Sequence, residues 1–251
     1  MSQPMNIILF GETGAGKSSI VNMLSGHPVA EISGEAGGCT FKFDWYPIDI
    51  GKETYRIFDT AGLDEGVEGT MPPEDAIVQL YQLMTSLEGG INLIIFVMRG
   101  PRIKDASQRN WRLFYEIFCK QQVNAAIVIT GLEQEDDMDD WWPRNKAHFY
   151  SYGMRPFGAA GITATLGKRK GNRYLFQEEY DESVAKVRKL IRDNAMPNPR
   201  CIDKVEWFAD VMLLWCIPVG QKSTAEVQRL IDRCGMSPDE AGRLARRLSY
   251  V

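Results

Sequence analysis

The sequence predicts an α/β fold with a mostly parallel central sheet and helices on both faces. Short, almost continuous apolar runs, bounded by glycine or polar residues, lie at residues 6–10, 91–97, 125–130 and 161–165. Such runs are typical of strands that are buried on both faces of a parallel sheet. Helical patterns lie between the runs, and this alternation predicts right-handed crossover connections.

The clearest helical pattern lies at residues 104–120. The aromatic residues Trp111, Phe114, Tyr115 and Phe118 recur there at intervals of three and four positions. At 3.6 residues per turn they form one apolar stripe, as expected of a helix that packs on the sheet.

A hairpin is predicted between the first two of these runs. Residues 41–50 and 53–59 read as strands, and Gly51 and Lys52 form the turn between them. We expect an antiparallel pair at the edge of the sheet, whose second strand ends on Asp59.

The chain is predicted to divide into a domain at 1–194 and a small helical extension at 195–251. Two prolines interrupt residues 194–200 and indicate a linker. Further on, the segment 237–240 offers a serine N-cap, a proline at the first helical position and a glutamate at the third. The extension is expected to pack on the first domain.

Composition excludes several classes of partner. Lys and Arg total 29 against 33 Asp and Glu, so the net charge of −4 provides no attraction to nucleic acid. The five cysteines include no CxxC pair, which argues against a disulfide framework or a zinc site and favours a cytoplasmic protein.

No transmembrane segment is expected, because no window approaches the roughly 20 apolar residues that a membrane helix needs. The apolar stretch at 204–219 is interrupted by Glu206 and Asp210. Packing on the first domain is the simpler interpretation of this stretch, and a helix that docks on a partner or a membrane surface is the alternative.

A glycine-rich loop follows the first apolar run and matches the pattern GxxxxGK[ST]. Its backbone N–H groups would wrap a phosphate, Lys17 would neutralise the β and γ phosphates, and Ser18 would coordinate Mg²⁺. The predicted nucleotide contacts of this loop are Gly11, Glu12, Thr13, Gly14, Ala15, Gly16, Lys17, Ser18 and Ser19.

The second motif is DTAG at residues 59–62, at the end of a predicted strand. Asp59 is placed to hold a water bound to Mg²⁺, and the N–H of Gly62 to sense the γ-phosphate. Thr40 ends a polar, glycine-rich segment and is the candidate for a further Mg²⁺ ligand. A threonine at the edge of a strand is the alternative interpretation of Thr40.

The segments GETGAGKSS, GGCTF, DTAGLDEG and RGPRIKDASQRNW together resemble septin-related P-loop GTPases, namely the immunity-associated GIMAP proteins and the chloroplast Toc receptors. The resemblance covers roughly residues 5–194. It implies a P-loop GTPase domain with GTP or GDP as ligand and Mg²⁺ as cofactor. It also implies a nucleotide-dependent homodimer, because several members dimerise across their nucleotide faces.

The base-reading segment departs from this family. GTPases usually select guanine with [NT]KxD, in which the Asp accepts two hydrogen bonds from the base and the Lys packs along it. Here Thr130, Gly131 and Glu133 occupy the matching positions, so a longer carboxylate is present and the lysine is absent. Ala164 resembles the middle residue of the last base-contacting loop. Predicted base contacts are therefore Thr130, Glu133 and Ala164.

Catalysis departs from the Ras-like pattern as well, because Leu63 stands where those enzymes place a glutamine. The resemblance implies that a residue supplied in trans completes the site. Arg99 and Arg102 are candidates for a transition-state charge, and surface ion pairing is the alternative for both. The candidate catalytic residues are Lys17, Thr40, Gly62 and Arg99.

Two functions follow from these observations. The first is a slow, Mg²⁺-dependent GTPase that acts as a molecular switch. The alternative is a nucleotide-regulated scaffold with negligible hydrolysis, which Leu63 and Gly131 favour.

Overall fold

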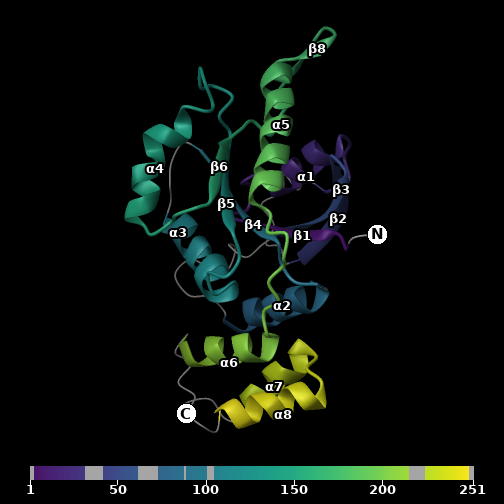
Figure 1. The fold of residues 1–251 in the computed structure, drawn as a ribbon, viewed down its shortest axis with the longest axis vertical. Coiled ribbons are helices and arrows are strands. Elements are labelled where there is room, and N and C mark those ends of the chain that lie inside the picture. Colours follow the sequence, from purple (N-terminus) through teal and green to yellow (C-terminus); the bar gives the residue numbers. More distant parts are fainter. Residues whose placement is uncertain are drawn as a thin grey trace.

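The computed structural model describes residues 3–31, 42–61, 73–87, 89–100, 105–214 and 224–248. A six-stranded sheet forms its centre, with the strand order β2-β3-β1-β4-β5-β6 (Figure 1). Its strands are β1 (Met5–Phe10), β2 (Lys42–Ile50), β3 (Glu53–Ala61), β4 (Leu93–Arg99), β5 (Ala125–Thr130) and β6 (Gly158–Gly161). Neighbouring strands are parallel, apart from the antiparallel hairpin of β2 and β3 at one edge. The α/β class and the edge hairpin are thus confirmed.

Helices cover both faces of the sheet, as predicted. They are α1 (Lys17–Ser25), α2 (Pro73–Ser86), α3 (Asp105–Trp111), the π-helix η1 (Arg112–Phe118), α4 (Trp141–Ser151) and α5 (Gln177–Asn194). Successive side chains of a strand point to opposite faces. Ile7 and Leu9 of β1 therefore pack in one core with α1 and α5, whereas Ile8 and Phe10 pack in the other with α2, α3, η1 and α4.

The helix predicted at 104–120 is continuous but changes its type. The α-helical part α3 ends at Trp111, and the chain continues as the π-helix η1. Three residues of the predicted apolar stripe, Trp111, Phe114 and Phe118, are buried, and Tyr115 is partly buried. Phe114 stacks on Phe10 of β1 with ring centroids 4.5 Å apart.

The last strand lies earlier than the sequence indicated. The apolar run predicted a strand at 161–165, but β6 ends at Gly161. Beyond it, the N–H of Thr163 donates to the hydroxyl of Ser183 at 3.0 Å, so the backbone leaves the ladder to bond a side chain of α5. A small hairpin of β7 (Arg169–Lys170) and β8 (Arg173–Tyr174) follows.

The extension forms three helices, α6 (Lys204–Leu214), α7 (Thr224–Cys234) and α8 (Pro238–Leu248). Figure 1 shows them together at one end of the molecule, beside α2. Trp207 of α6 is buried with its ring centroid 6.1 Å from that of Phe118 of η1, and Phe208 meets Tyr81 of α2 at the same distance. Val205, Trp207, Phe208 and Ala209 of the apolar stretch are therefore buried against the first domain or within the extension. None of the described helices is both long enough and apolar enough to span a bilayer.

The predicted start of α8 is confirmed. The N–H of Ser237 donates to the Glu240 carboxylate at 2.8 Å, and the N–H of Glu240 donates to the Ser237 hydroxyl at 3.3 Å. This reciprocal pair satisfies two N–H groups that the first turn of a helix leaves without a partner.

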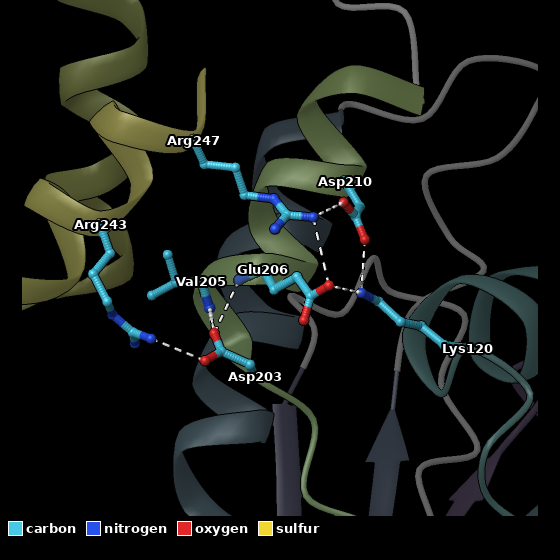
Figure 2. A network of polar contacts seen from close by, with 7 residues as sticks. All are labelled: Lys120, Asp203, Val205, Glu206, Asp210, Arg243 and Arg247. Carbon is cyan, nitrogen blue, oxygen red and sulfur yellow. Dashed lines mark hydrogen bonds and ion pairs between the residues drawn. The ribbon is translucent and has the colours of Figure 1, made fainter. Parts of the chain in front are cut away.

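Ion pairs join η1 to the extension (Figure 2). Lys120, just beyond η1, lies 2.6 Å from the Asp210 carboxylate and 3.5 Å from that of Glu206, both on α6. Arg247 of α8 reaches the same carboxylates at 3.2 Å and 3.5 Å. Two acidic side chains of α6 therefore lie between two cations from different elements.

Asp203 begins α6 and connects it to α8. Its carboxylate accepts hydrogen bonds from the N–H groups of Val205 and Glu206 and pairs with Arg243 at 2.9 Å (Figure 2). The pKa of Asp203 is lowered, mainly by the hydrogen bond from the Glu206 N–H and next by the pairing with Arg243. Burial acts in the opposite direction. The residue serves as an N-cap and as an anchor for α8.

Candidate nucleotide-binding site

The loop between β1 and α1 lies at the carboxyl edge of the sheet, where parallel α/β sheets bind ligands. Its three glycines have positive φ: 139° at Gly11, 74° at Gly14 and 99° at Gly16. A Cβ atom at Gly11 would lie 1.9 Å from the carbonyl oxygen of Val97 in β4. Only glycine allows the loop to pass so close to the neighbouring strand.

Lys17 opens α1 and is buried beneath this loop. Its ammonium donates to the carbonyl oxygens of Gly11 at 2.7 Å and Glu12 at 2.9 Å. The loop thus holds a buried positive charge at the N-terminus of a helix, where the helix dipole also favours an anion.

Ser18 and Asp59 meet at the same edge. The Ser18 hydroxyl donates to Oδ2 of Asp59 at 2.5 Å, although 41 positions separate the two residues. Asp59 is only 7% exposed, and its Oδ1 has no hydrogen-bond partner in the described part of the chain. Burial raises the pKa of Asp59, while the Ser18 hydroxyl and the charge of Lys17 act to lower it.

This donor set fits a magnesium ion. Buried polar groups almost always have a partner, and a bound cation would provide one for Oδ1 of Asp59. Mg²⁺ prefers hard oxygen ligands, and the Ser18 hydroxyl and Asp59 carboxylate supply two within hydrogen-bond distance of each other.

Thr130, at the end of β5, contacts the phosphate loop. Its hydroxyl donates to the carbonyl oxygen of Ala15 at 2.7 Å, and its methyl group would lie 3.3 Å from a Cβ atom at Gly16. The sequence predicted Thr130 as a base contact, which stays a prediction; in the structure its hydroxyl braces the loop.

A second brace comes from α3 and was not predicted. The buried hydroxyl of Ser107 donates to the Glu12 carboxylate at 2.8 Å. Ser107 lies 95 positions from Glu12, in the segment RGPRIKDASQRNW, and nothing in that segment indicates a contact with the phosphate loop.

The other predicted base contacts lie in two loops that are bonded to each other. The N–H of Leu132 donates to the Ile162 carbonyl at 3.2 Å, and the Thr163 hydroxyl donates to the Glu133 carboxylate at 3.2 Å. Ala164 follows Thr163 in the second loop. The structure therefore brings Glu133 and Ala164 to adjacent loops at the carboxyl edge of β5 and β6.

The remaining predicted residues are scattered around this site. Thr13 is exposed on the phosphate loop, and Ser19 lies in the first turn of α1. Arg99 ends β4, where it is the register partner of Thr130. Thr40, Gly62 and Arg102 lie outside the described residues, as do Leu63 and most of the segment that contains it.

The sheet order, the phosphate loop and the Ser18–Asp59 pair together define a P-loop nucleotide-binding domain of the GTPase class. Residues 6–130 match the family described as 50S ribosome-binding GTPase. This part of the chain belongs to that family of GTPase domains.

Two curated relatives from Arabidopsis thaliana are immune-associated nucleotide-binding proteins. Immune-associated nucleotide-binding protein 10 is 28% identical over 199 residues, which cover 76% of this chain and 40% of that protein. Immune-associated nucleotide-binding protein 7 is 29% identical over 161 residues, covering 61% of this chain and 50% of that protein. The chain thus spans half or less of the length of these relatives.

Solved structures of the chloroplast protein Toc33 share the fold. Toc33 from Arabidopsis thaliana in complex with GDP and Mg²⁺ is 17% identical, with a TM-score of 0.52, and the match covers 80% of this chain and 88% of that one. A second structure concerns the chloroplast translocon components atToc33 and psToc159, for which dimerisation is important for GTPase activity. It is 18% identical in sequence with a TM-score of 0.53, and the match covers 80% of this chain and 86% of that one.

Proposed function

We propose that this protein binds GTP and GDP together with Mg²⁺ and hydrolyses GTP slowly, as a molecular switch. The observation that carries the proposal is the pair of Ser18 and Asp59. A P-loop serine and a strand-end aspartate lie in contact beside Lys17, and one buried carboxylate oxygen lacks a partner in the described residues. This is the arrangement that a nucleotide with its metal ion requires.

The phosphates would be bound by the chain's own groups at the loop. Lys17 would exchange the loop carbonyls for phosphate oxygens, and the backbone N–H groups at the start of α1 would face the anion. Thr40 and Gly62 are proposed to contact the metal ion and the γ-phosphate when GTP is bound. Mg²⁺, held by Ser18 and Asp59, would neutralise the charge on the β and γ phosphates.

Hydrolysis would proceed by in-line attack of water. A bond forms between the water oxygen and the γ-phosphorus while the bond to the β–γ bridging oxygen breaks, which yields GDP, inorganic phosphate and a proton. Leu63 cannot orient that water as glutamine does. We therefore propose that a second copy of the chain, facing the first across the nucleotide, completes the site. The importance of dimerisation for the GTPase activity of atToc33 and psToc159 supports this proposal.

The rest of the chain is proposed to serve this switch. Residues 1–194 would act as the GTPase domain and residues 195–251 as a helical unit docked on α2 and η1, in a cytoplasmic protein. The aromatic contacts of Trp207 and Phe208 with these two elements support the docking.

Turnover measured at increasing protein concentration tests the proposal. Specific activity that rises with concentration, requires Mg²⁺ and is lost in Lys17→Ala would support a GTPase completed by dimerisation. Specific activity that is already full at the lowest concentration would contradict the dimerisation step alone. If GTP binds but is not turned over at any concentration, the enzyme proposal is wrong and the nucleotide-regulated scaffold replaces it.

A further inference from the structure

Gly131 has no side chain to cover the base, and the structure shows which side chain lies beside it. Gly131 follows β5 with φ 79°, in the left-handed region that favours glycine. A Cβ atom built there would lie 3.3 Å from Cγ and 3.5 Å from Nε of Arg99. The side chain of Arg99 therefore lies beside Gly131, on the side where a Cβ atom would be, and a side chain at position 131 would contact it tightly.

Arg99 reaches this position because of sheet register. It ends β4 directly beside Thr130, the last residue of β5, so its side chain lies next to the residue that follows Thr130. Thr130 is fixed in turn by its hydrogen bond to Ala15 of the phosphate loop. The position of Arg99 is thus set by two strands and does not depend on the conformation of a long loop.

The guanidinium of Arg99 does not stabilise the fold through a polar contact with the described part of the chain. Arg99 makes no hydrogen bond and no ion pair there, and its side chain is exposed. By contrast, Arg243 and Arg247 both have carboxylate partners. An unpaired, planar cation at the carboxyl edge of the sheet remains available to a ligand.

The neighbouring groups indicate which part of the ligand it would meet. Glu133 lies two positions after Gly131, and its carboxylate is held by the Thr163 hydroxyl at 3.2 Å. A carboxylate can accept hydrogen bonds from a purine edge that carries donors, as guanine does. Arg99 lies over Gly131, two positions before Glu133, and from there its planar guanidinium would stack on the face of a base whose edge Glu133 binds, by cation–π attraction.

We propose that Arg99 stacks on the guanine base of the bound nucleotide and so takes the place of a side chain that Gly131 lacks. The proposal rests on the proposed function, since it requires a guanine nucleotide at the P-loop. Arg99 supplies affinity for the base, and Glu133 reads its edge. This role differs from the transition-state charge that the sequence suggested for Arg99.

The test compares GDP with inorganic pyrophosphate, which presents the phosphates without the base. Binding of both ligands to the full chain is measured by calorimetry in the presence of Mg²⁺, for the wild type and for Arg99→Met. The methionine keeps much of the unbranched apolar stem and removes the cation. The control is Arg112→Met, which removes the same charge from a side chain that is 74% exposed on η1.

The expected result is a loss of GDP affinity of about tenfold in Arg99→Met with unchanged pyrophosphate affinity, since a desolvated cation–π contact is worth on this order. Arg112→Met should bind both ligands like the wild type. An equal loss for both ligands in Arg99→Met would overturn the proposal and support contact with the phosphates. Unchanged binding of both would overturn it in favour of a solvated arginine.

Failure of the proposed function would look different from either of these outcomes. In that case the wild type would bind GDP no more tightly than it binds pyrophosphate, or Lys17→Ala would still bind GDP. If the wild type binds GDP through Lys17 and Arg99→Met binds GDP with the same affinity, only the stacking of Arg99 is refuted.

Discussion

Asp59 is a buried carboxyl whose ionised form lowers the stability of the fold. Burial raises its pKa, so its ionised form is disfavoured in the folded chain relative to the unfolded one. A raised carboxyl pKa contributes stability at low pH, and this contribution is lost as the pH rises through the folded-state value. At neutral pH, and without a metal ion, the charge of Asp59 therefore opposes folding.

We predict that Asp59→Asn raises the thermal midpoint of the ligand-free protein at pH 7. The amide oxygen can still accept the bond from Ser18, while the buried charge is gone. The same variant should lose the further rise in midpoint that Mg²⁺ adds in the presence of GDP. A lower midpoint without ligand, or a Mg²⁺ effect like that of the wild type, would show that Asp59 has another role.

Glu133 is the carboxylate that we expect to bind the edge of the base. Replacing it by alanine removes the carboxylate that would accept hydrogen bonds from guanine, and bonds to a charged group are worth about 1.5–3 kcal/mol. Glu133→Ala should therefore weaken GDP binding by about tenfold to a hundredfold and leave ADP binding unchanged. Competition binding with both nucleotides measures the ratio. An equal effect on GDP and ADP would mean that Glu133 does not read the base.

At the scale of elements, the phosphate loop depends on its passage against β4. A Cβ atom at Gly11 would lie 1.9 Å from the Val97 carbonyl oxygen, whereas one at Gly14 would meet nothing within 4 Å. Both glycines have positive φ, but the 74° of Gly14 is near the left-handed α region, where a side chain costs roughly 1–2 kcal/mol, whereas the 139° of Gly11 is far from it. Only Gly11→Ala must also displace a buried strand or the loop.

Gly11→Ala should therefore destabilise the fold and abolish nucleotide binding, whereas Gly14→Ala should lose no more than about 2 kcal/mol of unfolding free energy. Urea unfolding followed by circular dichroism compares the two variants. Equal stability of the two would show that the loop moves away from β4 at little cost.

The elements could be predicted wherever their signal is local. The buried strands β1, β4 and β5 follow from continuous apolar runs, and the start of α8 follows from the Ser237–Glu240 capping box. The early end of β6 could not be read, because the hydrogen bond that ends it comes from Ser183 on α5. The change of helix type at Arg112 likewise has no signal in the aromatic stripe.

The candidate site divides in the same way. The phosphate loop and Asp59 could be identified from motifs, because their chemistry fixes the residue types and their spacing. The hydrogen bonds of Ser107 with Glu12 and of Thr130 with Ala15, and the cover that Arg99 gives to Gly131, join residues far apart in the sequence. Contacts of this kind follow from the register of strands and the packing of helices, which no single segment encodes.

At the scale of the whole molecule, the extension is bound to the helix that follows the second motif. Lys204 of α6 pairs with Glu240 of α8 at 2.8 Å and lies 5.3 Å from the ring of Tyr81 on α2. Burial acts to raise the pKa of Glu240, but hydrogen bonds from Lys204 and Ser237 outweigh it and lower the pKa to about 2.

This lowered pKa makes the pairing of α8 with α6 sensitive to acid. A depressed carboxyl pKa contributes stability above its ordinary value of 4.5, and that contribution is lost as the pH falls toward about 2. We predict that Glu240→Gln is less stable than the wild type at pH 7 and that the difference shrinks between pH 4.5 and pH 2. Chemical unfolding across this range measures it, and a difference that does not change with pH would contradict the assignment.

We propose above that the site binds a guanine nucleotide together with Mg²⁺. Calorimetric titration of the full chain with GDP, a non-hydrolysable GTP analogue and their adenine counterparts, each with and without Mg²⁺, would decide whether it does. We expect guanine nucleotides to bind more tightly than adenine nucleotides, with an affinity that falls when Mg²⁺ is removed and is lost in Lys17→Ala. Equal or tighter binding of adenine nucleotides, or binding independent of Mg²⁺, would show that the site does not select guanine nucleotides with Mg²⁺.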